Sequence, residues 1–154
     1  MELAYNQGGG TSQAVGALVF RGGASQTVSS MAAYVLQDGT VTGNFQMAIL
    51  EPTSNSSAVV IAVTAVAGSI SVSGGLFVLP LTAPVVLTAD DTYYLAVYNQ
   101  VNGSYLGAMS AGLATTQNAP PINFRVQNIS GFTLGDAVDI SDVSLQISPW
   151  LAAY

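Results

Sequence analysis

Residue types that could do catalytic chemistry are scarce in this chain. It contains no histidine, cysteine or lysine, and its only cationic side chains are Arg21 and Arg125. The usual general base near neutral pH, the thiol nucleophile, the Schiff-base amine and the base of a serine triad are therefore missing. A carboxylate pair of the glycosidase type remains, with Asp90 and Asp91, or Glu51 and a distant aspartate, as candidates. Acidic residues in a turn are usually solvated, so we predict no catalytic residue, no cofactor and no enzyme activity.

Three aspartates near the C-terminal end, Asp136, Asp139 and Asp142, could supply oxygen ligands to a metal ion. Carboxylates in a loop suit Ca²⁺. Their spacing differs from that of an EF-hand, and on a strand Asp139 would face away from the other two. We therefore favour an acidic loop that faces water, with a calcium site as the alternative.

Aromatic residues are the candidates for sugar binding. Those available are Tyr93, Tyr94, Tyr98, Tyr105, Trp150 and Tyr154. On a strand, Tyr94 and Tyr98 share one face, and Leu95 and Val97 share the other. If the second face is the core side, the two tyrosines stand on the outer face as ligand-facing aromatics. The alternative is that they pack beneath a neighbouring strand or subunit, as aromatic residues at this spacing commonly do.

The elements that must position these residues are strands. Residues 45–49 and 143–147 alternate between apolar and polar types, which is typical of strands with one buried face. Residues 59–63 and 93–98 are continuously apolar, as in strands covered on both faces. Gly, Asn, Asp and Pro gather in short turns between them, and no helical pattern is convincing. The sequence predicts one all-β sandwich or barrel domain, residues 14–154.

Residues 1–13 stand apart from this predicted domain as a flexible N-terminal arm. Apolar and polar residues alternate at its start, and three consecutive glycines follow. Such a segment is either a disordered tail or a tethered arm that adds a strand to the exposed edge of a neighbouring subunit. The residues of the predicted assembly arm are Leu3, Tyr5, Gly8, Gly9 and Gly10.

The charge balance restricts the partners. The 154 residues include two basic and eight acidic side chains, and the net charge is −6. Two cations cannot neutralise a row of phosphates, so nucleic acid is excluded as a partner. No apolar run reaches the roughly 18 residues of a membrane span. A surface this poor in charge tends to associate, which favours other copies of the chain as partners.

Several stretches together resemble a known group of domains. They are residues 40–49 (TVTGNFQMAI), 79–89 (LPLTAPVVLTA), 92–98 (TYYLAVY) and 143–153 (VSLQISPWLAA). The chain resembles the jelly-roll-like β-sandwich domains of bacterial surface proteins, found in collagen-like and spore-surface proteins of Bacillus relatives and in phage tails. The resemblance implies a jelly-roll sandwich at an extracellular or particle surface, without a catalytic residue. The arm is similar to the connectors of spore-appendage and pilus-type fibre subunits.

These features favour a structural subunit of an extracellular or spore-surface fibre or appendage. In such a homopolymer the arm of one subunit would complete the sheet of the next, and an open head-to-tail contact of this kind generates a filament. The alternative is a carbohydrate- or receptor-binding tip module of a surface or phage tail protein. In that case Tyr94 and Tyr98 would face a glycan.

Overall fold

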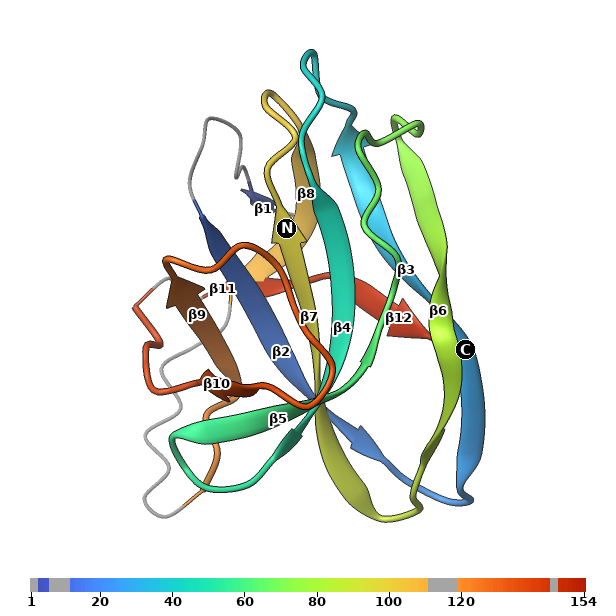
Figure 1. Cartoon of the computed structure of the whole chain (residues 1–154), viewed down its shortest axis with the longest axis vertical. Helices are drawn as coiled ribbons and strands as arrows, with labels where there is room; N and C mark the ends of the chain where they lie inside the picture. Colours follow the sequence, from blue (N-terminus) through green and yellow to red (C-terminus); the bar gives the residue numbers. More distant parts are fainter. Residues whose placement is uncertain (1–2, 6–11, 111–118, 145–146) are drawn as a thin grey trace.

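The computed structural model describes residues 3–5, 12–110, 119–144 and 147–154, which form strands and loops (Figure 1). No helix occurs within these residues, and so none of them forms an apolar helix that could cross a membrane. The described strands are β1 (Leu3–Tyr5), β2 (Gln13–Arg21), β3 (Gln26–Gln37), β4 (Phe45–Pro52), β5 (Ser57–Val63), β6 (Gly75–Leu87), β7 (Asp91–Asn99), β8 (Tyr105–Ser110), β9 (Asn123–Gln127), β10 (Ala137–Asp139), β11 (Ile147–Pro149) and β12 (Leu151–Ala153). The predicted all-β class is confirmed.

The described strands form two antiparallel sheets of six strands each. Sheet A has the order β1-β8-β3-β12, with β6 paired to β3 and β11 paired to β8. Sheet B has the order β10-β5-β4-β7-β2-β9. The two sheets face each other, and an isolated bridge between Thr64 and Leu81 joins them at one corner. The predicted antiparallel sandwich is confirmed, and its jelly-roll subtype stays a prediction.

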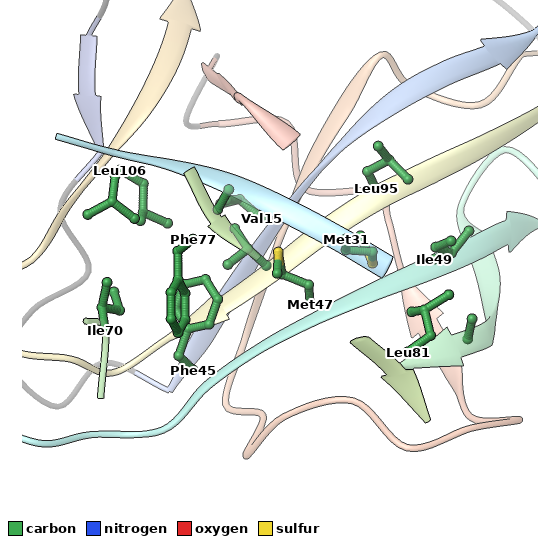
Figure 2. Close-up of a cluster of buried hydrophobic side chains, with 14 of the residues drawn as sticks. Val15, Met31, Phe45, Met47, Ile49, Ile70, Phe77, Leu81, Leu95 and Leu106 are labelled. Atoms are coloured by element: carbon green, nitrogen blue, oxygen red, sulfur yellow. The ribbon is translucent and has the colours of Figure 1, made fainter. Parts of the chain in front are cut away.

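The interior between the sheets is filled by alternate residues of the facing strands (Figure 2). On β4, Phe45, Met47 and Ile49 point into it, as the period-2 pattern predicted. The other face of β4, which that pattern assigned to solvent, is buried as well. Phe45 meets Phe77 of β6 edge-on, with ring centroids 5.3 Å apart and planes at 71°. Burial of each large apolar side chain contributes about 1.5 to 3 kcal/mol, so this layer supplies much of the folding free energy.

Sheet B is also buried on its other face. The chain that follows β9 crosses this face, where Phe132 and Ile140 join a second apolar cluster with Tyr94 and Tyr98 of β7. The strand thus has apolar neighbours on both sides. This confirms the prediction that residues 93–98 form a strand covered on both faces.

Charge is segregated between the two sheets. The six strands of sheet A contain no charged residue. The charged residues that lie within described strands are all in sheet B: Arg21, Glu51, Asp91, Arg125 and Asp139. Sheet A is therefore an uncharged layer, and its surfaces can contact another molecule without removing an ion from water.

Candidate functional site: the edge and outer face of sheet A

The predicted arm forms a strand in the structure. β1 pairs antiparallel with β8 of the same chain, in the register Leu3↔Ala108, Ala4↔Gly107 and Tyr5↔Leu106. Pairing with a neighbouring subunit therefore stays a prediction. The predicted hinge, Gly8, Gly9 and Gly10, lies outside the described residues.

The sandwich itself begins slightly earlier than the predicted residue 14. β2 starts at Gln13, which pairs with Gln127 of β9. The carbonyl oxygen of Ser12 accepts a hydrogen bond of 3.1 Å from the backbone N–H of Ile129. Main-chain bonds thus tie Ser12 and Gln13 to β9 and to the loop after it.

The strand β8 has different neighbours along its two edges. On one edge β3 pairs with it at Leu106 and Tyr105, and β11 pairs with it from Ala108 to Ser110. Along its other edge, β8 pairs with the three-residue strand β1, and no other described strand pairs with it there. This second edge, defined here as the β8 edge, is closed by β1 and not by a long strand of the sandwich.

A fork between strands lies along the other edge of β8. β3 and β8 pair only around Val35–Leu106 and Gln37–Tyr105 and then separate. The C-terminal segment fills the gap, with β11 on β8 and β12 on β3. Between them, the Trp150 N–H donates to the Gly107 carbonyl at 2.9 Å, and the Trp150 carbonyl accepts from the Tyr34 N–H at 3.3 Å. The backbone of Trp150 is thus fixed at the fork from both sides.

A cleft opens above the fork on the outer face of sheet A, the face directed away from sheet B. Its volume is about 360 Å³, and Tyr34, Gly107, Ala108, Met109 and Trp150 line it. The rings of Tyr34 and Trp150 meet edge to face, with centroids 6.1 Å apart and planes at 70°. A Cβ atom on Gly107 would lie 3.1 Å from Cδ1 of Tyr34, so the tyrosine ring packs closely over the glycine. We name these five residues the fork cleft.

Sequence reasoning missed the fork cleft. Trp150 was one of several aromatic candidates, and nothing in the sequence selected it or paired it with Tyr34. A usable signal follows Pro149, where Trp150 and Tyr154 are four residues apart, so that they share one face of a strand, and are 43 % and 47 % exposed. This spacing indicates a strand that directs aromatic rings outward.

The prediction that Tyr94 and Tyr98 face a ligand is wrong. Their side chains are 0 % and 1 % exposed, respectively. Tyr94 packs edge-on against Phe124 of β9 at a centroid distance of 5.1 Å, and its hydroxyl donates to the Pro121 carbonyl. The alternative interpretation, packing beneath a neighbouring strand, is the one observed. Tyr94 and Tyr98 do share one face of the strand, as predicted, but residues far along the sequence cover that face.

Burial of these two phenols predicts a loss of stability in alkali. Desolvation raises the pKa of both Tyr94 and Tyr98 above the ordinary value of 10.0. Above that pH the unfolded chain binds fewer protons than the folded one, so the free energy of unfolding falls as pH rises. Each buried tyrosine adds up to about 1.4 kcal/mol per pH unit to this slope.

We expect Tyr94→Phe to reduce that slope, measured by denaturant unfolding between about pH 9 and pH 11. Tyr154→Phe, at a tyrosine that is 47 % exposed, controls for loss of a hydroxyl. An equal slope in Tyr94→Phe and the unmodified protein would contradict the expectation.

The three C-terminal aspartates do not form a metal site. Asp142 makes an ion pair of 2.8 Å with Arg125, and hydrogen bonds from Ser144, followed by the charge of Arg125, lower its pKa. Hydrogen bonds from Ser141 lower the pKa of Asp139. The described residues contain no group of three or more His, Cys, Asp or Glu that could hold a metal ion. The calcium alternative with Asp136, Asp139 and Asp142 is therefore not supported.

A scan against protein-family models and searches of curated proteins and of solved structures found no match to this chain. The resemblance to bacterial surface domains therefore stays a prediction. Function has to be inferred from the β8 edge and the fork cleft themselves.

Proposed function

We propose that this protein is a non-catalytic structural subunit that assembles with copies of itself by exchange of strand β1. Within one chain, β1 pairs with β8 over three residue pairs. The same pairing between the β1 of one copy and the β8 of another would join two subunits through identical hydrogen bonds. Exchange of an identical element between copies is a low-cost route to assembly. When each copy donates its strand to the next copy, head to tail, the result is a filament.

The observation that supports this proposal most strongly is the difference between the β8 edge and the other sheet edges. Proteins protect exposed edges with charged residues, proline or very short strands. The opposite edge strand of sheet A, β6, contains Pro80 and Pro84. The edge strands of sheet B contain Arg125 in β9 and Asp139 in β10. β8 has the sequence YLGAMS and carries none of these protections, so it is the edge suited to receive a strand.

The strength and reach of the arm agree with exchange. A three-residue strand forms only a few main-chain hydrogen bonds of about 1 kcal/mol each, so pairing within the chain is weak enough to open. Residues 6–11 link Tyr5 to Ser12 and can span at most about 25 Å. A donor subunit must therefore place its body close to the acceptor's β8 edge. The uncharged strands of sheet A permit such an approach without removing an ion of these strands from water.

The proposed setting is the surface of a cell or spore, in a fibre or appendage. It follows from the resemblance of the sequence and from the absence of His, Cys and Lys chemistry in the chain. The subunit would use neither a cofactor nor nucleic acid.

Disulfide capture between two single-cysteine variants tests the exchange directly. Leu3 and Ala108 lie opposite each other in the register, and opposite residues of antiparallel strands have the Cα separation that a disulfide needs. We expect Leu3→Cys, mixed with a mass-tagged Ala108→Cys and oxidised, to give a mixed dimer on a non-reducing gel. The chain has no native cysteine, so this bond can form only across subunits.

Met109→Cys is the matched control for the register. Met109 follows Ala108 on the same strand but points to the opposite face, where it is 60 % exposed. Leu3→Cys should form a disulfide with Met109→Cys far less than with Ala108→Cys, although position 109 is more accessible to solvent. The double variant Leu3→Cys/Ala108→Cys should give covalent multimers at high concentration. If it gives only an internally bridged monomer at every concentration, the exchange proposal is refuted.

A further inference from the structure

The fork cleft is held by main-chain bonds that do not involve β1. The main chain of Trp150 is bonded to Gly107 of β8 and to Tyr34 of β3, so the indole extends from a fixed position. Tyr34 is held over Gly107, whose missing side chain leaves room for the ring. Sites built on strands hold their side chains in place before a ligand arrives, which reduces the entropy lost on binding.

The chemistry of the fork cleft limits the class of ligand. None of its described lining residues is charged, and neither is any residue in the strands of sheet A. A phosphate or a carboxylate would lose hydration there and gain no ion pair. The cleft offers two aromatic rings at 70°, and the indole N–H and the phenol hydroxyl are the polar groups at their edges. A neutral ligand with an apolar face and a polar rim fits this arrangement.

We infer that the fork cleft binds a neutral saccharide. The C–H face of a pyranose ring is apolar and can pack on the Trp150 indole, while its hydroxyl groups project sideways to the phenol of Tyr34 and to water. The cleft volume of about 360 Å³ lies in the range of small-ligand sites and suits one or two sugar rings. This site is separate from Tyr94 and Tyr98, and it goes beyond the proposed function because it requires no second subunit.

Trp150 makes the inference measurable in the intact protein. It is the only tryptophan of the chain, so its fluorescence reports on this cleft alone. We expect cellobiose, maltose or N,N′-diacetylchitobiose to give a saturable change in emission with a Kd of about 1 mM or lower. A disaccharide that contains glucuronic acid should bind more weakly than its neutral counterpart, because the protein carries a net charge of −6.

Variants separate the cleft from the rest of the surface. Tyr34→Ala should weaken binding about tenfold or more, and Tyr34→Phe should weaken it less because the ring remains. Trp150→Ala should abolish binding, and Trp150→Tyr should retain part of it. Because both variants lack the fluorophore, calorimetry measures their binding. Phe20→Ala removes an aromatic ring of sheet B that is 65 % exposed and should leave the Kd unchanged. Circular dichroism and melting temperature confirm that each variant is folded.

Two results would overturn the inference. One is the absence of a saturable change with any of the three neutral sugars up to about 20 mM. The other is a change in emission that depends on the protein concentration and not on the sugar concentration. Such a change would identify the outer face of sheet A as a contact between copies. Neither result bears on disulfide capture at the β8 edge, so failure here is distinguishable from failure of the assembly proposal.

Discussion

Gln46→Leu is expected to lower the free energy of unfolding by about 3 to 5 kcal/mol. The Gln46 side chain is 5 % exposed and joins sheet B to the segment that covers it. Its Nε2 donates to the carbonyl oxygens of Thr64 and Phe132, both at 3.1 Å, and its Oε1 accepts from the Phe132 N–H at 2.7 Å. Leucine would leave these buried backbone groups without partners, at about 1 to 3 kcal/mol for each group that water cannot reach.

The loss should extend beyond the three hydrogen bonds. Phe132 and Ile140 cover Tyr94 and Tyr98 only while this segment stays on sheet B. Urea unfolding and amide hydrogen exchange measure the two effects, and exchange should rise first in residues 128–140. Gln37→Leu is the control, because Gln37 is exposed and makes one long bond of 3.4 Å. A difference within about 0.5 kcal/mol between the two variants would contradict the role given to Gln46.

The same covering segment explains where sequence reasoning worked and where it failed. Alternation along β4 and the apolar run of β7 identified both strands, and strand parity sorted their residues correctly between two faces. The patterns could not identify what lies on each face, because that depends on contacts with residues far along the chain, about 30 to 45 positions further for β7 and 86 positions further for Gln46 of β4. Tyr94 was assigned to solvent for this reason, although Phe124 and Phe132 belong to the same cluster. The period-2 pattern shows which residues of a strand share a face, and only the tertiary fold determines whether that face is buried.

The fork cleft was beyond reach for a related reason. Tyr34 and Trp150 meet because β3 and β8 separate after two residue pairs and the C-terminal segment enters between them. No local pattern encodes the point at which two strands diverge. The arm is the opposite case, since the alternation at Leu3 and Tyr5 indicated a strand, and residues 3–5 do form one. Sequence identified the strand β1, and the topology was needed to identify β8 as the strand with which it pairs.

Edge protection also links sequence to assembly in a way that only the topology reveals. Proline in β6, Arg125 in β9 and Asp139 in β10 are unremarkable until the sheet order shows that these are edge strands. Once the edges are known, the β8 edge stands out as uncharged, free of proline and longer than the three-residue strand β12, which shares the first two properties. The assembly proposal therefore depends on β1 being the element that closes this edge.

Deletion of residues 1–11 is expected to abolish assembly and leave a folded domain. It removes β1 but retains the bond from Ile129 to Ser12 and all of β2. Only a few main-chain hydrogen bonds are lost, so stability should fall by no more than about 3 kcal/mol. Sedimentation and electron microscopy should then show a monomer at concentrations where the full chain forms filaments. Tyr5→Pro is a single-residue version, because Tyr5 pairs with Leu106 of β8 and proline cannot donate a hydrogen bond to a strand partner.

The truncated chain also makes a sharper test, because it keeps the acceptor edge and lacks the donor strand. Mixed with the full chain, it can receive an arm at its β8 edge but cannot pass one on, so it should terminate every filament that it joins. Mean filament length should therefore fall in proportion as its fraction rises. A truncated chain with Ala108→Pro, which places proline in the acceptor strand β8 opposite Leu3, should shorten filaments less. If filament length does not change with the fraction of truncated chain, assembly does not proceed by donation of β1 to β8.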